Sequence, residues 1–136
     1  MKLLGYESVA SYGEAKGIQN DAVLKRKLTD QEFQHVDKLL HSHSSPGTKV
    51  GVIICLRSLK DVADQKRALG LIAPFAGDPE IAVGIRMVIE GYANAGSDAV
   101  RLWLQSDDAT LRDMASEACK KAREGQWRQQ NERHSP

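Results

Sequence analysis

The chain has 136 residues, enough for one domain built around a single hydrophobic core. Residues of the AVILMFWYC set make up 41% of it and charged residues 27%, so composition excludes collagen-like, coiled-coil and wholly disordered chains. Lysine and arginine number 19 and aspartate and glutamate 18, which leaves a formal net charge of +1. The chain as a whole therefore lacks the field that would collect nucleic acid or an acidic membrane surface.

Cysteine usage and the N-terminal sequence predict a cytoplasmic protein. Cys55 and Cys119 lack the spacing of a zinc site and are too few for a disulfide framework, which favours a reducing compartment. The N-terminus reaches Gly5 and Glu7 before any apolar run long enough for a signal peptide. No stretch approaches the roughly 18 apolar residues of a membrane span.

Apolar residues recur at helical spacing from about residue 29 onward, whereas the alternation typical of strands is scarce. The pattern predicts an all-α protein of six helices, most of them with a recognisable start or stop. The expected ranges are 29–42, 48–59, 62–76, 78–92, 97–104 and 106–125.

Local chemistry marks the expected helix starts. Thr29 and Glu32 form a capping box, in which the two side chains satisfy backbone N–H groups of the first turn. Asp78 is an N-cap, and Pro79 suits the first helical position because it gives up no hydrogen bond there. The caps of the last two helices are assigned to Ser97 and to residues 106–108.

Proline and glycine mark the expected helix stops. Pro46 and Gly47, within the segment 43–47, are expected to end the first helix. Pro74 is late enough in the third helix either to kink it or to close it. Gly125 is expected to end the last helix as a C-terminal glycine.

An internal repeat is the strongest signal in the sequence. A shift of 30 residues aligns the two aspartate caps, and a shift of 31 aligns the second helix with the fourth. The chain therefore predicts three helix pairs over 29–60, 61–93 and 94–125, each too thin to bury its own apolar face. The aligned positions are Asp78 with Asp108, Ile81 with Leu111, Ile85 with Ala115, Val88 with Ala118, Ile89 with Cys119, Val50 with Ile81 and Ile54 with Ile85.

These repeats resemble the HEAT-like α-solenoid family. The resemblance rests on Asp-Pro-Glu-Ile at 78–81 and Asp-Ala-Thr-Leu-Arg at 108–112, each opening the second helix of a pair. Arg112 stands where the family often has an arginine, and Ala82 takes that place one repeat earlier. The resemblance covers 48–125 well and implies a right-handed stack of helix pairs that serves as a protein-binding scaffold.

The small size of the chain makes the function that this resemblance implies more specific. A small free-standing solenoid suits a stoichiometric inhibitor or adaptor, and small domains of this kind occur among bacterial immunity proteins and phage-encoded inhibitors. We therefore expect a protein that neutralises a cognate protein by binding it. The expected organisation is an N-terminal cap over 1–28, helical repeats over 29–125 and a polar, frayed tail over 126–136.

The partner surface is expected on the concave face, which the second helices of a solenoid line. Trp103, in a short helix that is apolar almost all round, is either covered by Trp127 or exposed for a partner or for self-association, and the same holds for Leu104. The non-core positions of the concave face, with Ala82 and Met87 between them, are Arg86, Glu90, Arg112, Ser116 and Lys120.

Two alternatives stay open, while no catalytic residue, cofactor or metal is expected. An enzyme would use Cys55 or the histidines His35, His41 and His43, although a structural thiol and a solvated helix end explain these residues as well. A nucleic-acid-binding protein would use the basic residues of two segments. These are Lys25, Arg26 and Lys27 near the N-terminus, and Lys120, Lys121, Arg123, Arg128 and Arg133 near the C-terminus.

Overall fold

A computed structural model describes residues 28–134, with side chains over 28–126. Every regular element in this range is a helix, which confirms the all-α prediction. The expected N-terminal cap lies outside the described residues apart from Leu28. The elements are α2 (Asp30–Leu40), α3 (Pro46–Cys55), the 3-10 turn η1 (Leu56–Ser58), α4 (Val62–Ile72), η2 (Ala73–Phe75), α5 (Pro79–Asn94), η3 (Asp98–Val100), α6 (Arg101–Leu104) and α7 (Ala109–His134).

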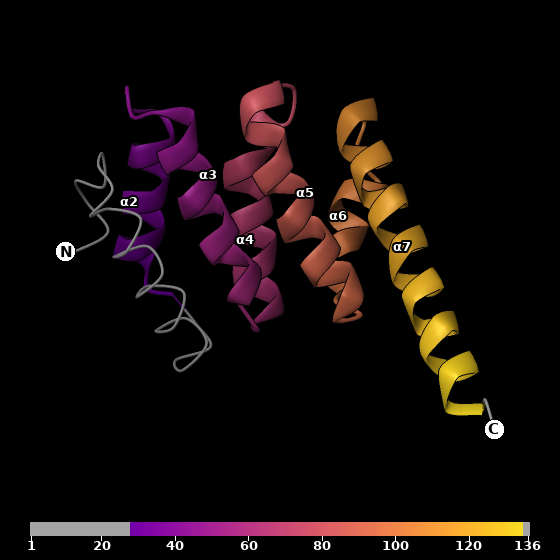
Figure 1. Cartoon of the computed structure of the whole chain (residues 1–136). Helices are drawn as coiled ribbons and strands as arrows, with labels where there is room; N and C mark the ends of the chain where they lie inside the picture. The colour runs from indigo at the N-terminus through magenta and orange to yellow at the C-terminus, as the bar shows by residue number, and fades with distance from the viewer. Residues whose placement is uncertain (1–27, 135–136) are drawn as a thin grey trace.

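The helices lie in two layers (Figure 1). α3, α5 and α7 pack against one another in that order and form one layer. α2 contacts α4, and α4 contacts η3, which leads directly into α6, so these elements form the other layer. Each of α2, α4 and α6 also contacts the helix that follows it in the chain. The described residues therefore form a row of three helix pairs.

The helix starts follow the local chemistry that the sequence indicates. The Thr29 hydroxyl accepts from the Glu32 N–H at 3.2 Å, and the Glu32 carboxylate accepts from the Thr29 N–H at 3.1 Å, which confirms the capping box. Asp78 caps α5 by accepting from the Glu80 N–H at 3.0 Å, with Pro79 in the first turn. These helix starts can be predicted without knowledge of the tertiary structure, because each capping side chain forms its hydrogen bond within its own turn.

The two later starts are also confirmed. The Ser97 hydroxyl accepts from the Ala99 N–H at 3.1 Å, and the helix there begins as the 3-10 turn η3 before α6. Asp108 caps α7, because its carboxylate accepts from the Thr110 N–H at 2.8 Å and lies 3.4 Å from the Leu111 N–H. Side-chain oxygens therefore occupy the expected cap positions of both last helices.

Pro46 was expected to end the first helix, and this expectation is wrong. α2 ends at Leu40, and Pro46 is the first residue of α3, where its missing N–H costs no helical hydrogen bond. Ser45 caps that helix by accepting from the Thr48 N–H at 3.2 Å. Pro74 closes α4, which passes into η2 after Ile72.

The expected helix end at Gly125 is also wrong. α7 continues through Gly125 to His134. Among the described glycines only Gly96 has a positive φ, at 69°, so Gly125 lacks the left-handed conformation of a terminating glycine. The residues from Gln126 to Arg133 include no proline, and their side chains tolerate a helix well.

One apolar cluster runs between the two layers and reaches all three helix pairs. Its largest members are at most 2% exposed. None of the described helices combines the length and the apolar composition needed to cross a membrane. The large buried side chains include Phe33 and Leu40 from α2, Ile53 from α3, Leu56 from η1, Leu69 and Ile72 from α4, Ile85, Ile89 and Tyr92 from α5, and Trp103 from α6.

The rotation of α3 differs from the expected alignment. Val50 and Ile54 are only half-buried, while Val52 and Leu56 are 1% and 2% exposed, so burial in α3 does not follow the alignment of Val50 with Ile81 and Ile54 with Ile85. Apolar residues occupy nearly every position between 50 and 56, and such a helix has no single stripe that fixes its rotation. Packing decides it instead.

α3 and α5 approach closely at Gly84. A Cβ at this buried position would lie 3.2 Å from a methyl of Val50 and 3.4 Å from its carbonyl oxygen. Val50 therefore packs against the backbone of α5, and its remaining surface faces solvent. This crossing places the exposed side of α3 next to that of α5.

Polar contacts join the helix pairs at one end of the layers. The Gln65 amide donates to the Leu59 carbonyl at 2.8 Å and accepts from the Ser97 hydroxyl. The Tyr92 hydroxyl donates to the Leu56 carbonyl at 2.6 Å, and burial, aided by the charge of Asp64, raises the pKa of this phenol well above its usual range. Each of these bonds links neighbouring pairs.

Candidate functional site

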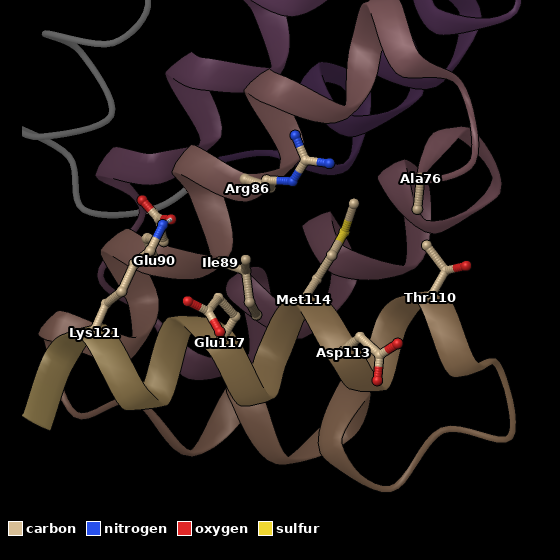
Figure 2. A pocket seen from close by; sticks show the side chains of 9 residues that line it. All are labelled: Ala76, Arg86, Ile89, Glu90, Thr110, Asp113, Met114, Glu117 and Lys121. Carbon is tan, nitrogen blue, oxygen red and sulfur yellow. Dashed lines mark hydrogen bonds and ion pairs between the residues drawn. The ribbon is translucent and has the colours of Figure 1, made fainter.

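A groove of about 300 Å³ lies between α5 and α7. Figure 2 shows Ile89 and Met114 between its two walls, with charged side chains around them. Ile89 is fully buried and Met114 is 9% exposed, so the floor is apolar and the accessible rim is polar. The lining residues are Ala76, Arg86, Ile89, Glu90, Thr110, Asp113, Met114, Glu117 and Lys121.

One ion pair closes one end of the groove. The Lys121 ammonium donates to the Glu90 carboxylate at 2.9 Å, from α7 to α5. The hydrogen bond to Glu90 and its charge hold the pKa of Lys121 above its ordinary value. The charge of Glu117 acts in the same direction and that of Arg86 opposes it. Glu90 and Lys121 therefore neutralise each other.

The remaining charges of the groove are divided between its walls. Arg86 on the α5 wall and Asp113 on the α7 wall have no hydrogen-bond or ion-pair partner within residues 28–126. Asp113 and Glu117 are both exposed and lie one turn apart on α7. The groove thus presents one unpaired cation on one wall and two carboxylates on the other.

An apolar strip adjoins this groove on the α3 and α5 side. Val83 is 50% exposed and Met87, one turn later on α5, is half-buried. Val50 and Ile54 on α3 are half-buried, and Val50 packs against Gly84. We call these four side chains, Val50, Ile54, Val83 and Met87, the apolar strip. Arg86 follows Val83 by three residues and therefore lies between the strip and the groove.

Of the residues expected on the binding face, the structure brings Arg86 and Glu90 into the groove. Arg112, Ser116 and Lys120 are exposed but do not line it. The corresponding wall is formed by Asp113, Glu117 and Lys121, each one position later.

This displacement has a geometric cause. Equivalent positions of two successive helices point in the same direction, whereas a groove between helices is lined by facing sides. The counterparts of Arg86 and Glu90 in α7 therefore cannot form the opposite wall. Helical spacing places Arg112 and Ser116 on the side of α7 that faces away from α5. The sequence could have revealed Asp113 and Glu117 if facing sides had been paired.

Trp103 was expected at a partner surface or under Trp127, and the structure places it in the core. Its side chain is 2% exposed and belongs to the apolar cluster between the layers, so it offers no surface to a partner. The exposed apolar residues of this short helix are Leu102, 45% exposed, and Leu104, 36% exposed. The side chain of Trp127 lies outside the described residues.

The described part of the chain shows where the residues of the enzyme alternative lie. No group of three or more histidine, cysteine, aspartate or glutamate side chains is arranged to hold a metal ion there. His41 lies 3.3 Å from the Asp37 carboxylate and packs edge-on against Phe75. Cys55 is buried, and its thiol donates to the Gly51 carbonyl at 3.2 Å. His43 is exposed.

The two basic segments are only partly described. Lys120, Lys121 and Arg123 are exposed on α7. The side chains of Arg128 and Arg133 lie outside the described residues, as does the whole segment 25–27. Lys121 is engaged by Glu90, so two basic side chains of the described set are left for a phosphate.

Comparisons with known proteins give no assignment. No protein-family model, no curated protein and no solved structure matches this chain.

Proposed function

We propose that the chain is a short α-solenoid of HEAT-like helix pairs that acts, without catalysis, as a protein-binding module. Its binding surface is the exposed face of α3, α5 and α7. The two-layer row of helix pairs and the equivalent aspartate caps of α5 and α7 support the solenoid assignment. The more specific form of this proposal is an inhibitor of the immunity-protein kind, which binds one cognate protein and covers its active surface.

The observation that carries the proposal is the apolar strip beside a charged groove. Val83 exposes half of its side chain in the middle of the layer, next to the half-buried Met87. Exposed apolar surface rimmed by polar groups is typical of protein interfaces, where a few buried side chains supply most of the affinity. The charged rim guides encounter and orientation.

Nucleic acid is the second candidate, and among the described residues the exposed Lys120 and Arg123 favour it. The groove argues against it, because its lining includes Arg86 and Lys121 but three carboxylates, a balance of −1. Phosphate binding needs several unpaired cations on one surface. Retention on DNA or RNA that declines steeply with salt would favour this candidate over a protein partner.

Capture from a lysate of the source organism tests the proposal. The tagged chain is the bait, and Val83→Glu places a charge in the apolar strip. The matched control is Val62→Glu on α4, because Val62 is 40% exposed but belongs to the other layer. Circular dichroism verifies that both variants keep their helicity.

We expect the native chain and the Val62→Glu variant to retain the same proteins, quantified by mass spectrometry, and Val83→Glu to lose them. Burying the new carboxylate without a partner would weaken binding at least about tenfold. Equal retention by all three chains would remove the α3, α5 and α7 face from consideration.

A further inference from the structure

We propose that the α5–α7 groove and the apolar strip bind a polypeptide segment in which a lysine or arginine accompanies an apolar residue. This inference rests on the proposed function and adds the chemistry of the partner. The apolar strip gives the surface to be covered, and the charges of the adjoining groove decide what covers it.

The α7 wall of the groove favours a cation. Asp113 and Glu117 are exposed carboxylates four residues apart on a helix, where like charges repel each other. The one cation on the same wall, Lys121, is already held by Glu90. A basic side chain from a partner would relieve the repulsion, whereas an acidic side chain would increase it.

The α5 wall favours an acceptor. Arg86 has no ion-pair or hydrogen-bond partner within residues 28–126, and Figure 2 shows it across the groove from Asp113 and Met114. A guanidinium donates readily to backbone carbonyl oxygens, which every peptide segment provides. Its place beside Val83 puts the acceptor between the basic and the apolar residue of the partner.

The spacing of the two subsites fits a short segment. Neighbouring packed helices lie roughly 8–10 Å apart, so the α7 carboxylates and the apolar strip are separated by about that distance. About three residues of extended chain or about two turns of helix span it. Ile89 and Met114 are nearly covered, so the apolar residue of the partner belongs on Val83 and Met87 and not on the groove floor.

A random peptide library displayed on phage, selected on the intact chain, tests the inference. The selected sequences should be enriched in lysine or arginine next to apolar residues. Affinities of the corresponding synthetic peptides are then measured by fluorescence anisotropy. The double variant Asp113→Asn with Glu117→Gln should bind them about three- to tenfold more weakly, the range expected for losing two exposed ion pairs.

The matched control is Asp107→Asn with Glu124→Gln, which changes net charge equally at two exposed acids outside the groove. It should leave affinity unchanged. Enrichment of acidic peptides, or equal weakening by both double variants, would overturn the inference. It would also be overturned if sedimentation showed that Val83→Glu dissociates the chain into monomers, because a second copy would then occupy the strip.

The two proposals fail differently. If Val83→Glu abolishes capture of cellular proteins while Asp113→Asn with Glu117→Gln leaves both peptide and protein binding intact, the binding face stands and the basic partner does not. If Val83→Glu also has no effect, both proposals fall together.

Discussion

α5 and α7 are built on the same plan and differ in what they show to their surroundings. Both begin with an aspartate that accepts from the first-turn N–H groups. Both bury the equivalent core positions Ile85 and Ala115 completely. The two helices differ on the flank, the side of each helix next to its core stripe. There Ala82 of α5 is 3% exposed, whereas its counterpart Arg112 in α7 is exposed.

The difference follows from the neighbours of each helix. The flank of α5 that carries Arg86 and Ile89 faces α7, and Ala82 lies on the same side one turn earlier. α7 packs against α5 and α6, and its opposite flank is polar, with Arg112, Ser116 and Arg123 exposed. The two helices thus share the position of their cap and core, while their flanks differ with the presence of a neighbouring helix.

The largest loss of stability is expected when the flank residue of one helix is replaced by its counterpart from the other helix. Ala82→Arg buries an unpaired guanidinium against α7 and should lower the free energy of unfolding by about 4 kcal/mol. Arg112→Ala removes one exposed hydrogen bond to the Ser106 carbonyl, 2.9 Å long, and should cost less than about 1 kcal/mol. Urea unfolding followed by circular dichroism measures both. Similar losses would mean that the two flanks have similar surroundings.

The equivalent core positions of α5 and α7 should differ in what a truncation costs. Ile85→Ala removes three carbon atoms from a fully buried position and should cost about 3 kcal/mol. The equivalent Ala115→Gly creates almost no cavity and should cost about 1 kcal/mol, the helix-propensity difference. The midpoints of urea unfolding, compared at an unchanged dependence of the unfolding free energy on urea concentration, would verify that Ile85→Ala costs more than Ala115→Gly. A smaller loss for Ile85→Ala would show that α5 packs more loosely than its burial indicates.

Tyr92 has no counterpart with a hydroxyl in α7, because Ala122 takes its place. Tyr92→Phe leaves the Leu56 carbonyl without its donor and should cost about 1 kcal/mol near neutral pH. Burial raises the phenol pKa above its ordinary value of 10.0, so ionisation favours the unfolded chain once the pH exceeds that value.

The gap between the native chain and Tyr92→Phe should therefore close as the pH rises past 10.0, by about 1.4 kcal/mol per pH unit. Unfolding curves of both chains, recorded in parallel on either side of that pH, supply the measurement. A gap that stays constant would mean that the phenol ionises as readily in the folded chain as in the unfolded one.

The smallest effects concern the caps. Asp78→Ala and Asp108→Ala should each cost about 1 kcal/mol, because each leaves first-turn N–H groups without an acceptor. Asp107→Ala is the matched control, since Asp107 is exposed and does not cap α7. Thermal unfolding distinguishes the three. If Asp107→Ala lowered the stability as much as Asp108→Ala, Asp108 would not be the residue that caps α7.

The sequence predicted those features that are decided within one helical turn. The capping box of Thr29, the caps at Asp78 and Asp108, and the core stripe of α5 each follow from spacing and hydrogen-bonding chemistry alone. The same local reasoning failed at Pro46, where one residue suits both a helix stop and a helix start.

Features that depend on neighbouring helices could not be read in this way. The rotation of α3 is set by packing at Gly84, since apolar residues surround that helix. The single core stripe of α5 is enough to place Arg86 outside the core, whereas the opposite wall of the groove requires knowing that Asp113 faces it. The burial of Trp103 likewise depends on the helices that cover it.

The hydrogen bonds of Gln65 bear on the mechanics of the molecule. The amide nitrogen holds the turn that leaves the first helix pair, through Leu59, and the amide oxygen holds the serine that opens the third, Ser97. One side chain therefore connects three consecutive helix pairs along one edge. Gln65→Glu would remove the bond to Leu59 and Gln65→Leu would remove both bonds, so a single substitution would loosen the contacts between the helix pairs at this edge.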